Sequence, residues 1–115
     1  MKMCDEMRKL RQKLTERSIE WTDESSLNSD ADIEKKRRVL PDIPESYLDT
    51  SMFRTRFIFK GKNWSVINGY GSYGGYDPFK SENEGLLELM IDENDPTGWL
   101  TAEQVIEMIY NLEKM

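Results

Sequence analysis

The first part of the chain has the apolar spacing of a helix. Four apolar residues recur at intervals of four, three and four positions: Met3, Met7, Leu10 and Leu14. This spacing puts them on one side of a helix, so we expect a helix over residues 3–17 that packs on a sheet. Ile19–Thr22 then alternates apolar and polar residues, which predicts a short strand.

The centre of the chain has the alternation of a β-hairpin. Between Met52 and Lys60, phenylalanines and cations occupy opposite faces: Phe53, Phe57 and Phe59 against Arg54, Arg56 and Lys60. Gly61-Lys62-Asn63 has turn chemistry, and Trp64–Asn68 is the expected return strand. Because two strands alone are marginally stable, we expect Ile19–Thr22 to add a third strand and the N-terminal helix to cover the Phe face.

Two helices are expected near the C-terminus. The first spans Glu84–Ile91, where apolar residues point largely one way, and the polar segment after it ends it. The second begins at Thr101, because Gln104 follows three residues later as in a capping box. Leu100 is placed to pack on Val105 at the start of this helix.

Together these elements predict one α+β domain over residues 1–115, with a small antiparallel sheet packed against an N-terminal helix and two C-terminal helices. Residues 23–50 interrupt the pattern, because they are rich in Asp, Glu, Ser and Pro and lack a sustained period. We expect a mobile loop or insertion there, with a helical turn near Asp32–Val39. The basic run Lys35–Arg38 lies among acids, so we interpret it as part of a solvated loop rather than a phosphate-binding patch.

Composition narrows the classes of function. The chain contains no histidine and one cysteine, Cys4. This excludes imidazole catalysis, Cys–His nucleophile pairs and an intrachain disulfide, and we expect neither enzyme activity nor a cofactor or metal. No apolar run approaches the roughly 20 residues that span a bilayer, and the opening segment lacks the apolar core of a signal peptide. We therefore expect a cytoplasmic protein.

Charge is distributed unevenly along the chain. The net charge is −6, but residues 77–115 carry ten acids and two bases, a net −8, and residues 1–76 therefore carry +2. An acidic surface attracts basic proteins and repels nucleic acid, although such a surface also serves simply as a solvated face. We expect a partner protein with a basic surface to contact seven of these carboxylates: Glu84, Glu88, Asp92, Glu93, Asp95, Glu103 and Glu107.

A glycine-rich loop follows the hairpin. Gly69, Gly71 and Gly74 fit the G-x-G-x-x-G spacing of dinucleotide-binding proteins. That fingerprint needs a strand before it and a helix directly after it in a βαβ unit, and here it follows the second strand of a hairpin. The spacing alone therefore does not predict a dinucleotide site.

Three interpretations of this loop remain open. The glycines permit tight turns and close packing, which needs no ligand. Alternatively, Tyr70, Tyr73 and Tyr76 are the aromatic anchors of a protein-binding loop. In the third interpretation the glycine N–H groups hold the anion of a small nucleotide, tyrosines stack on its base, and Arg54 or Arg56 meets its phosphate.

Two further features favour structural roles. The segment Glu93–Gln104 is similar to a calcium-binding EF-hand loop, but its last residue cannot supply the bidentate carboxylate that such a loop requires. A helix-capping turn explains the segment better. Trp21, Trp64 and Trp99 each adjoin apolar residues, and we expect them to share one core.

Three runs of the sequence, WSVINGYGSYGG, GLLELM and PTGWLTAEQVIEMI, resemble short uncharacterised proteins of phages and mobile elements of gut Firmicutes. The resemblance covers the N-terminal helix with IEWTD and residues 57–110, and it skips the loop at 24–50. It carries across no catalytic or binding residues, but it implies a context, because small acidic proteins of mobile elements often inhibit host defence.

The resulting hypothesis is a non-catalytic inhibitor that blocks a basic, nucleic-acid-binding groove of a host factor such as a CRISPR effector. The alternative is a protein that sequesters a nucleotide signal with the glycine- and tyrosine-rich loop of residues 69–76, which we call the Gly/Tyr loop. A structural accessory protein that acts as an oligomer is a third possibility.

Overall fold

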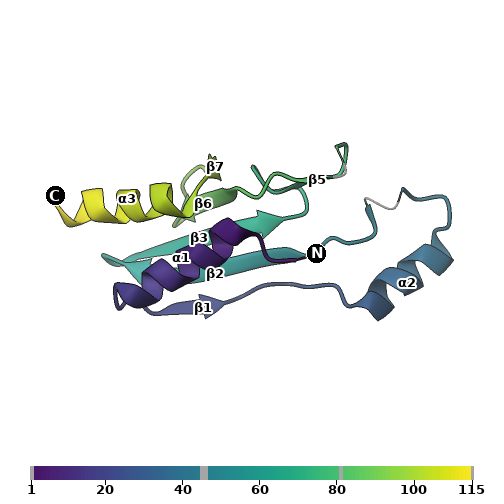
Figure 1. The fold of residues 1–115 in the computed structure, drawn as a ribbon, viewed down its shortest axis with the longest axis horizontal. Helices are drawn as coiled ribbons and strands as arrows, with labels where there is room; N and C mark the ends of the chain where they lie inside the picture. The colour runs from purple at the N-terminus through teal and green to yellow at the C-terminus, as the bar shows by residue number, and fades with distance from the viewer. Residues whose placement is uncertain (1, 45–46, 81, 115) are drawn as a thin grey trace.

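The computed structural model describes residues 2–44, 47–80 and 82–114. Its elements are, in chain order, α1 (Asp5–Glu16), β1 (Trp21–Asp23), α2 (Asp30–Val39), β2 (Met52–Phe59), β3 (Lys62–Gly69), β4 (Tyr76–Asp77), β5 (Glu82–Asn83), β6 (Leu87–Ile91), β7 (Thr97–Leu100) and α3 (Ala102–Glu113). Helices α1 and α3 pack together on one side of the main sheet, and α2 stands apart at one end of the molecule (Figure 1). The predicted α+β class is confirmed.

The main sheet has five strands in the order β1-β2-β3-β6-β7, and every neighbouring pair is antiparallel. The β2–β3 hairpin is confirmed, with its turn at Lys60 and Gly61, whose φ angles of 51° and 75° suit a tight hairpin turn. The predicted strand Ile19–Thr22 is confirmed as β1, shifted toward the C-terminus, and it pairs with β2 as expected. Strands β4 and β5 form a separate two-stranded sheet.

The core lies between one face of the sheet and the two helices. It includes the three apolar residues Met7, Leu10 and Leu14 of α1, the Phe face of β2, and alternate residues of β3 and β6. Trp64 is fully buried at its centre, stacked on Phe57 with ring centroids 5.4 Å apart. The stripe of α1 therefore covers the sheet as the sequence predicts.

The two helices are also joined by polar contacts between distant parts of the chain. The backbone N–H of Ala102 donates to Glu6 Oε1 (2.8 Å), so a side chain of α1 caps the first turn of α3. At the opposite ends of the helices, Arg17 pairs with Glu113 (3.1 Å). The predicted capping box is confirmed, because Gln104 N–H donates to Thr101 Oγ1 and Thr101 N–H donates to the Gln104 side chain.

The helix predicted over Glu84–Ile91 is wrong: Leu87–Ile91 is strand β6. Leu87 and Leu89 are buried on the core face, while Glu88 and Met90 point to the other face. The apolar period here is two rather than 3.6, and the pairing of β6 with β3 decides between the two patterns. Of the two helices predicted near the C-terminus, residues 82–114 therefore contain one, α3.

The prediction that the three tryptophans share one core is only partly correct. Trp64 is in the core and Trp21 packs at its margin, but Trp99 is 56% exposed. Trp99 belongs to β7, a strand that the sequence analysis took for a capping turn.

The segment between β1 and β2 forms an arm that lengthens the molecule to 53 Å (Figure 1). The predicted helical turn is confirmed as α2, a ten-residue helix capped by Ser29 and Asp32 and without a buried residue. Lys36 from the basic run holds the base of the arm, donating to Asn28, the Leu48 carbonyl and Thr50. Residues 45–46 of the predicted loop lie outside the described residues. In the described part of the chain, no helix has the length and hydropathy needed to cross a membrane.

Candidate interaction surface

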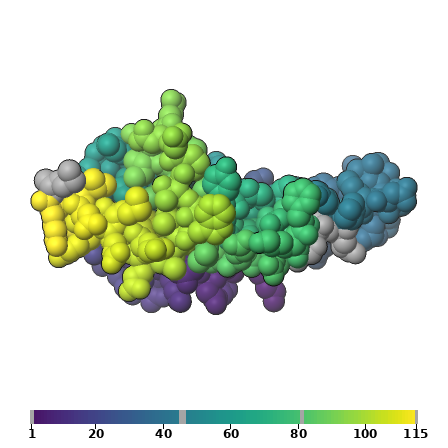
Figure 2. All heavy atoms as spheres, turned by 90° about the horizontal axis from the view of Figure 1, so that it is seen from above, coloured from purple at the N-terminus to yellow at the C-terminus, as the bar shows by residue number. Residues whose placement is uncertain are grey.

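The acidic C-terminal part of the sequence is also one region in space. Figure 2 shows that the light-green to yellow residues, which include β7 and α3, form a continuous part of one face of the molecule. Seven of the ten acids of residues 77–115 belong to the part of the chain from β6 to α3. We call this part of the surface, from β6 to α3, the acidic face.

The seven predicted carboxylates fall into two groups. Three of them serve the fold: Glu84 accepts from Trp99 Nε1 (3.1 Å), Glu88 from Tyr73 N–H (2.8 Å), and Asp92 from Asn63 N–H (2.8 Å). The other four are exposed and have no hydrogen bond or ion pair with the described residues: Glu93, Asp95, Glu103 and Glu107. This second group is free to meet a partner.

Two exposed aromatic rings stack on each other, and one of them belongs to strand β7 of this face. Tyr73 and Trp99 stack with centroids 5.4 Å apart and ring planes 18° from parallel, although they come from the loop after β3 and from β7. Half or more of each residue is exposed, 50% for Tyr73 and 56% for Trp99. Trp99 N–H also donates to the Tyr73 carbonyl (3.2 Å), which fixes the loop to the strand. We call these two residues the aromatic pair.

The backbone of β7 explains why Trp99 is on the surface. Leu87 pairs with Leu100 and Leu89 with Thr97, so β7 holds one extra residue at a β-bulge. Trp99 sits in this bulge with a φ of 55°, a left-handed conformation that is uncommon for a bulky residue. The bulge redirects the indole out of the core and onto the surface.

Two glycines allow the aromatic pair to form. A Cβ at Gly98 would overlap the Cβ of Tyr73, and a Cβ at Gly74 would lie 3.1 Å from the Trp99 backbone. The φ of Gly74 is also 94°, which favours glycine. The close packing of Tyr73 and Trp99 therefore explains why positions 74 and 98 are glycines, and no ligand is needed to account for them.

The other predicted tyrosines belong to a second aromatic group. Tyr70 stacks with Tyr76 at 6.5 Å, and Tyr47 contacts both Tyr70 and Phe79 edge to face. This group joins the base of the arm to the loop. The structure thus divides the predicted tyrosine anchors, with Tyr73 in the aromatic pair and Tyr70 and Tyr76 elsewhere.

The Gly/Tyr loop uses most of its own N–H groups. Those that donate within the protein belong to Gly69, Tyr70, Gly71, Ser72, Tyr73 and Gly75. An anion site needs several N–H groups that converge and remain unpaired. The loop therefore has the hydrogen bonding of a packed turn.

Arg54 and Arg56, the arginines expected to meet the phosphate of a small nucleotide, lie on the open face of the main sheet. Arg54 and Arg56 line a cavity of about 630 Å³ together with residues of β3 and β6 and with residues 92–94, which bring the carboxylates of Asp92 and Glu93 beside the arginines. None of the residues 69–76 lines it. Arg56 pairs with Glu24 (2.7 Å), whereas the buried Nε of Arg54 has no hydrogen-bond partner within the described residues. The structure does not bring the arginines and the loop into one site.

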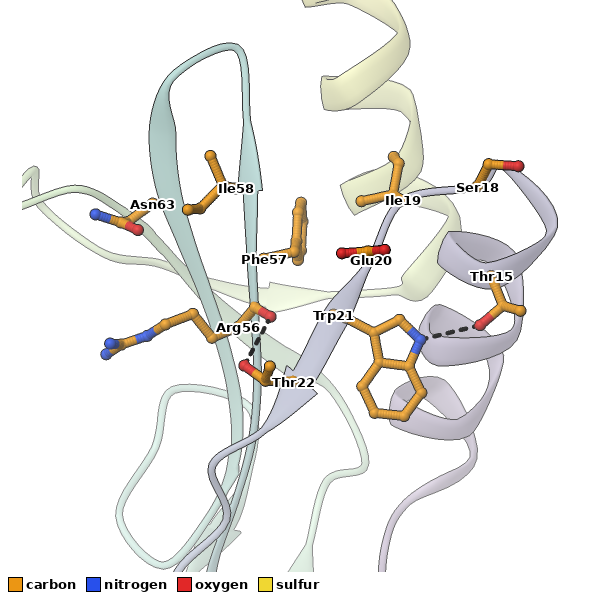
Figure 3. A pocket seen from close by; sticks show the side chains of 10 residues that line it. All are labelled: Thr15, Ser18, Ile19, Glu20, Trp21, Thr22, Arg56, Phe57, Ile58 and Asn63. Carbon is orange, nitrogen blue, oxygen red and sulfur yellow. Dashed lines mark hydrogen bonds between the residues drawn. The ribbon is translucent and has the colours of Figure 1, made fainter.

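A larger open cavity, about 940 Å³, lies beside the edge strand β1 (Figure 3). Ile19, Trp21 and Ile58 give it an apolar lining, and Trp21 Nε1 donates to Thr15 Oγ1 (3.0 Å) at its wall. Its charged residues are Glu20 and Arg56, so it carries no group of acids and bases placed for catalysis. No pattern in the sequence points to this cavity.

The described residues contain no group of three or more His, Cys, Asp or Glu side chains that could hold a metal ion. Burial raises the pKa of the Cys4 thiol, which lowers its reactivity as a nucleophile.

No family model matches the chain, and searches of curated proteins and of solved structures found no match.

Proposed function

We propose that this protein is a non-catalytic inhibitor that binds a basic protein surface with its acidic face. The observation that carries the proposal is the excess of acidic residues between β6 and α3, where four exposed carboxylates have no hydrogen bond or ion pair with the described residues: Glu93 and Asp95 after β6, and Glu103 and Glu107 on α3. Such a surface complements a groove that binds nucleic acid, and its occupation would keep nucleic acid out.

The finer form of the proposal is an anti-defence protein of a phage or mobile element. Its target would be a nucleic-acid-binding defence protein, such as a CRISPR effector, in the cytoplasm of a bacterial host. The support for this form is the sequence resemblance together with the acidic face, because defence nucleases carry basic grooves that hold nucleic acid. The inhibition is steric and electrostatic and needs no bond-making step.

Charge reversal tests the proposal. The tagged protein is used to capture basic proteins from bacterial lysate at low salt, and the captured protein is identified by mass spectrometry. Its affinity is then measured for wild type and for the triple variant Asp95→Lys, Glu103→Lys, Glu107→Lys. We expect the variant to lose binding, and wild-type affinity to fall as salt rises, since screening weakens exposed charge pairs.

The matched control reverses three exposed carboxylates outside the acidic face: Glu20→Lys, Asp30→Lys and Asp42→Lys. This control changes the net charge equally and should retain most of the binding. Unchanged affinity of the first variant at low salt would contradict the proposal. A circular dichroism spectrum of each variant shows that the fold is kept.

A second candidate function, binding of a small nucleotide, is favoured by one observation. The buried Nε of Arg54 has no hydrogen-bond partner within the described residues. Arg54 and Arg56 also line the cavity of about 630 Å³. In this candidate function the phosphate would meet the two arginines, beside the carboxylates of Asp92 and Glu93, and not the Gly/Tyr loop. Cyclic nucleotides at 100 times their dissociation constant should stabilise the fold by about 2.7 kcal/mol, and no thermal shift with them would argue against this candidate.

A further inference from the structure

We infer that the aromatic pair, Tyr73 and Trp99, is the anchor point of the acidic face and binds an arginine side chain of the partner. This inference rests on the proposed function, because it assumes a basic partner. It adds a specific site to a diffuse electrostatic surface. It also assigns a binding role to Trp99, which the sequence places in the core.

The first argument is that the fold holds Trp99 outside the core. A tryptophan gains more from burial than almost any other residue, yet the β7 bulge and a φ of 55° present this one to solvent. The Tyr73 ring stacks on it and Glu84 holds its indole N–H, so the ring is fixed before any partner arrives. A fixed aromatic surface loses little conformational freedom on binding, which is a property of strong interface anchors.

The second argument is the charge beside the rings. The two side chains that hydrogen-bond to the aromatic pair are carboxylates, Glu84 and Glu88. Each carboxylate can accept further hydrogen bonds beyond the one it makes to the pair. Lys80 is 3.7 Å from Glu84, an exposed contact that a partner's cation can displace at small cost.

The third argument is a comparison with other aromatic rings of the protein. Tyr110 on α3 is exposed to a similar extent, 47%, but Lys114 already lies over its ring at 4.3 Å. Trp21 likewise has Arg11 over its ring at 4.8 Å. Among the described residues, no cation lies over Trp99, so its ring remains open to a cation from outside.

These features select arginine over lysine. The guanidinium group is planar, stacks on an aromatic ring and donates several hydrogen bonds in its own plane. It can therefore stack on the aromatic pair while it donates to Glu84 or Glu88. An ammonium group has the charge but lacks the flat face.

The test uses synthetic peptides as probes and nuclear magnetic resonance of the full chain. The probes are the acetylated, amidated pentapeptide Arg-Gly-Arg-Gly-Arg, the same peptide with lysine, and the same peptide with citrulline, which has nearly the shape of arginine without its charge. We expect the arginine peptide to shift the Trp99 indole N–H and the Tyr73 amide saturably. The lysine peptide should bind more weakly, and the citrulline peptide should leave both resonances in place.

The matched variants are Trp99→Asn and Tyr110→Asn. Asparagine accepts the left-handed conformation at position 99, so the first variant removes the ring without adding strain. We expect it to raise the dissociation constant of the arginine peptide about tenfold, while Tyr110→Asn, which removes a similarly exposed aromatic, leaves it unchanged. The indole signal missing from the first variant also assigns the Trp99 resonance.

Several outcomes would overturn the inference. These are no shift at Trp99 with the arginine peptide, equal shifts with the citrulline peptide, or equal affinities of the two variants. If the peptide shifts only resonances near Glu103 and Glu107, the anchor is wrong while the acidic face still binds cations. A different result would contradict the proposed function: the partner would still bind after charge reversal of the acidic face.

Discussion

Asn68 and Asn83 exchange two side-chain hydrogen bonds, from Asn68 Nδ2 to Asn83 Oδ1 (3.1 Å) and from Asn83 Nδ2 to Asn68 Oδ1 (2.9 Å). Asn68 is fully buried at the end of β3, and its Nδ2 also donates to the Leu86 carbonyl (2.8 Å). The pair joins the main sheet to β5, and so positions the segment that leads to Glu84 and β6.

Replacement of Asn68 by alanine should destabilise the protein by about 1–3 kcal/mol, because it leaves the Leu86 carbonyl and the Asn83 amide without their partner. Urea unfolding followed by tryptophan fluorescence measures the loss. Asn111→Ala, at an exposed position on α3, is the control and should change the free energy of unfolding by less than about 0.5 kcal/mol. Additive effects of Asn68→Ala and Asn83→Ala in a double-mutant cycle would contradict a coupled pair.

Removal of the Glu6 carboxylate should weaken the start of α3. Glu6→Ala leaves the Ala102 N–H without its acceptor, at an expected cost of about 0.5–2 kcal/mol, as for other helix caps. Glu6→Gln keeps an acceptor oxygen at the same place and should recover most of the stability in thermal unfolding. Equal losses for the two variants would show that charge, and not the cap, is what matters.

Disruption of the helix α2 should leave the stability of the rest of the protein nearly unchanged. Lys35→Pro breaks the helix in its interior, but α2 has no buried residue, so the global free energy of unfolding should change by less than about 0.5 kcal/mol. The helical signal in circular dichroism should fall. Lys9→Pro is the comparison, because α1 covers the core, and it should cost about 3 kcal/mol or more. A large loss from Lys35→Pro would mean that the helix α2 itself supports the rest of the domain.

The Cys4 thiol should react slowly in the folded protein. Burial raises its pKa, so at pH 8 a smaller fraction is thiolate than in the unfolded chain, and the thiolate is the form that reacts. The rate of reaction with a disulfide reagent, compared between native protein and protein in urea, checks this. The native rate should rise with pH toward the raised pKa, and a native rate equal to the unfolded one would contradict the prediction.

The parts of the fold that were predictable from the sequence are those with a long, unmixed period. The β2–β3 hairpin alternates over eight residues on each strand, and α1 and α3 each have a stripe over twelve residues. Glu84–Ile91 is too short for its period to be distinct, and its pairing with β3, a contact between distant residues, makes it a strand.

The candidate site was predictable in its charge but not in its geometry. The acidic bias is visible in the sequence, whereas only the structure shows that Glu93 and Glu103 are free while Glu88 holds the loop. Trp99 was missed because tryptophan beside apolar residues is usually buried. The local sequence around Gly98 and Trp99 does not indicate a bulge. The bulge arises from the register between β6 and β7, which brings together residues from two strands.

The contact between Glu6 and Ala102 has a consequence for synthesis of the chain. The strands of the main sheet pair in the order in which they are made, so the sheet can grow as the chain leaves the ribosome. The helix α1 is made before the sheet, but its contacts with α3, Glu6 to Ala102 and Arg17 to Glu113, each join residues 96 positions apart. Until α3 emerges, the nascent chain exposes apolar surface that α3 later covers, and in this interval that surface is accessible to a chaperone.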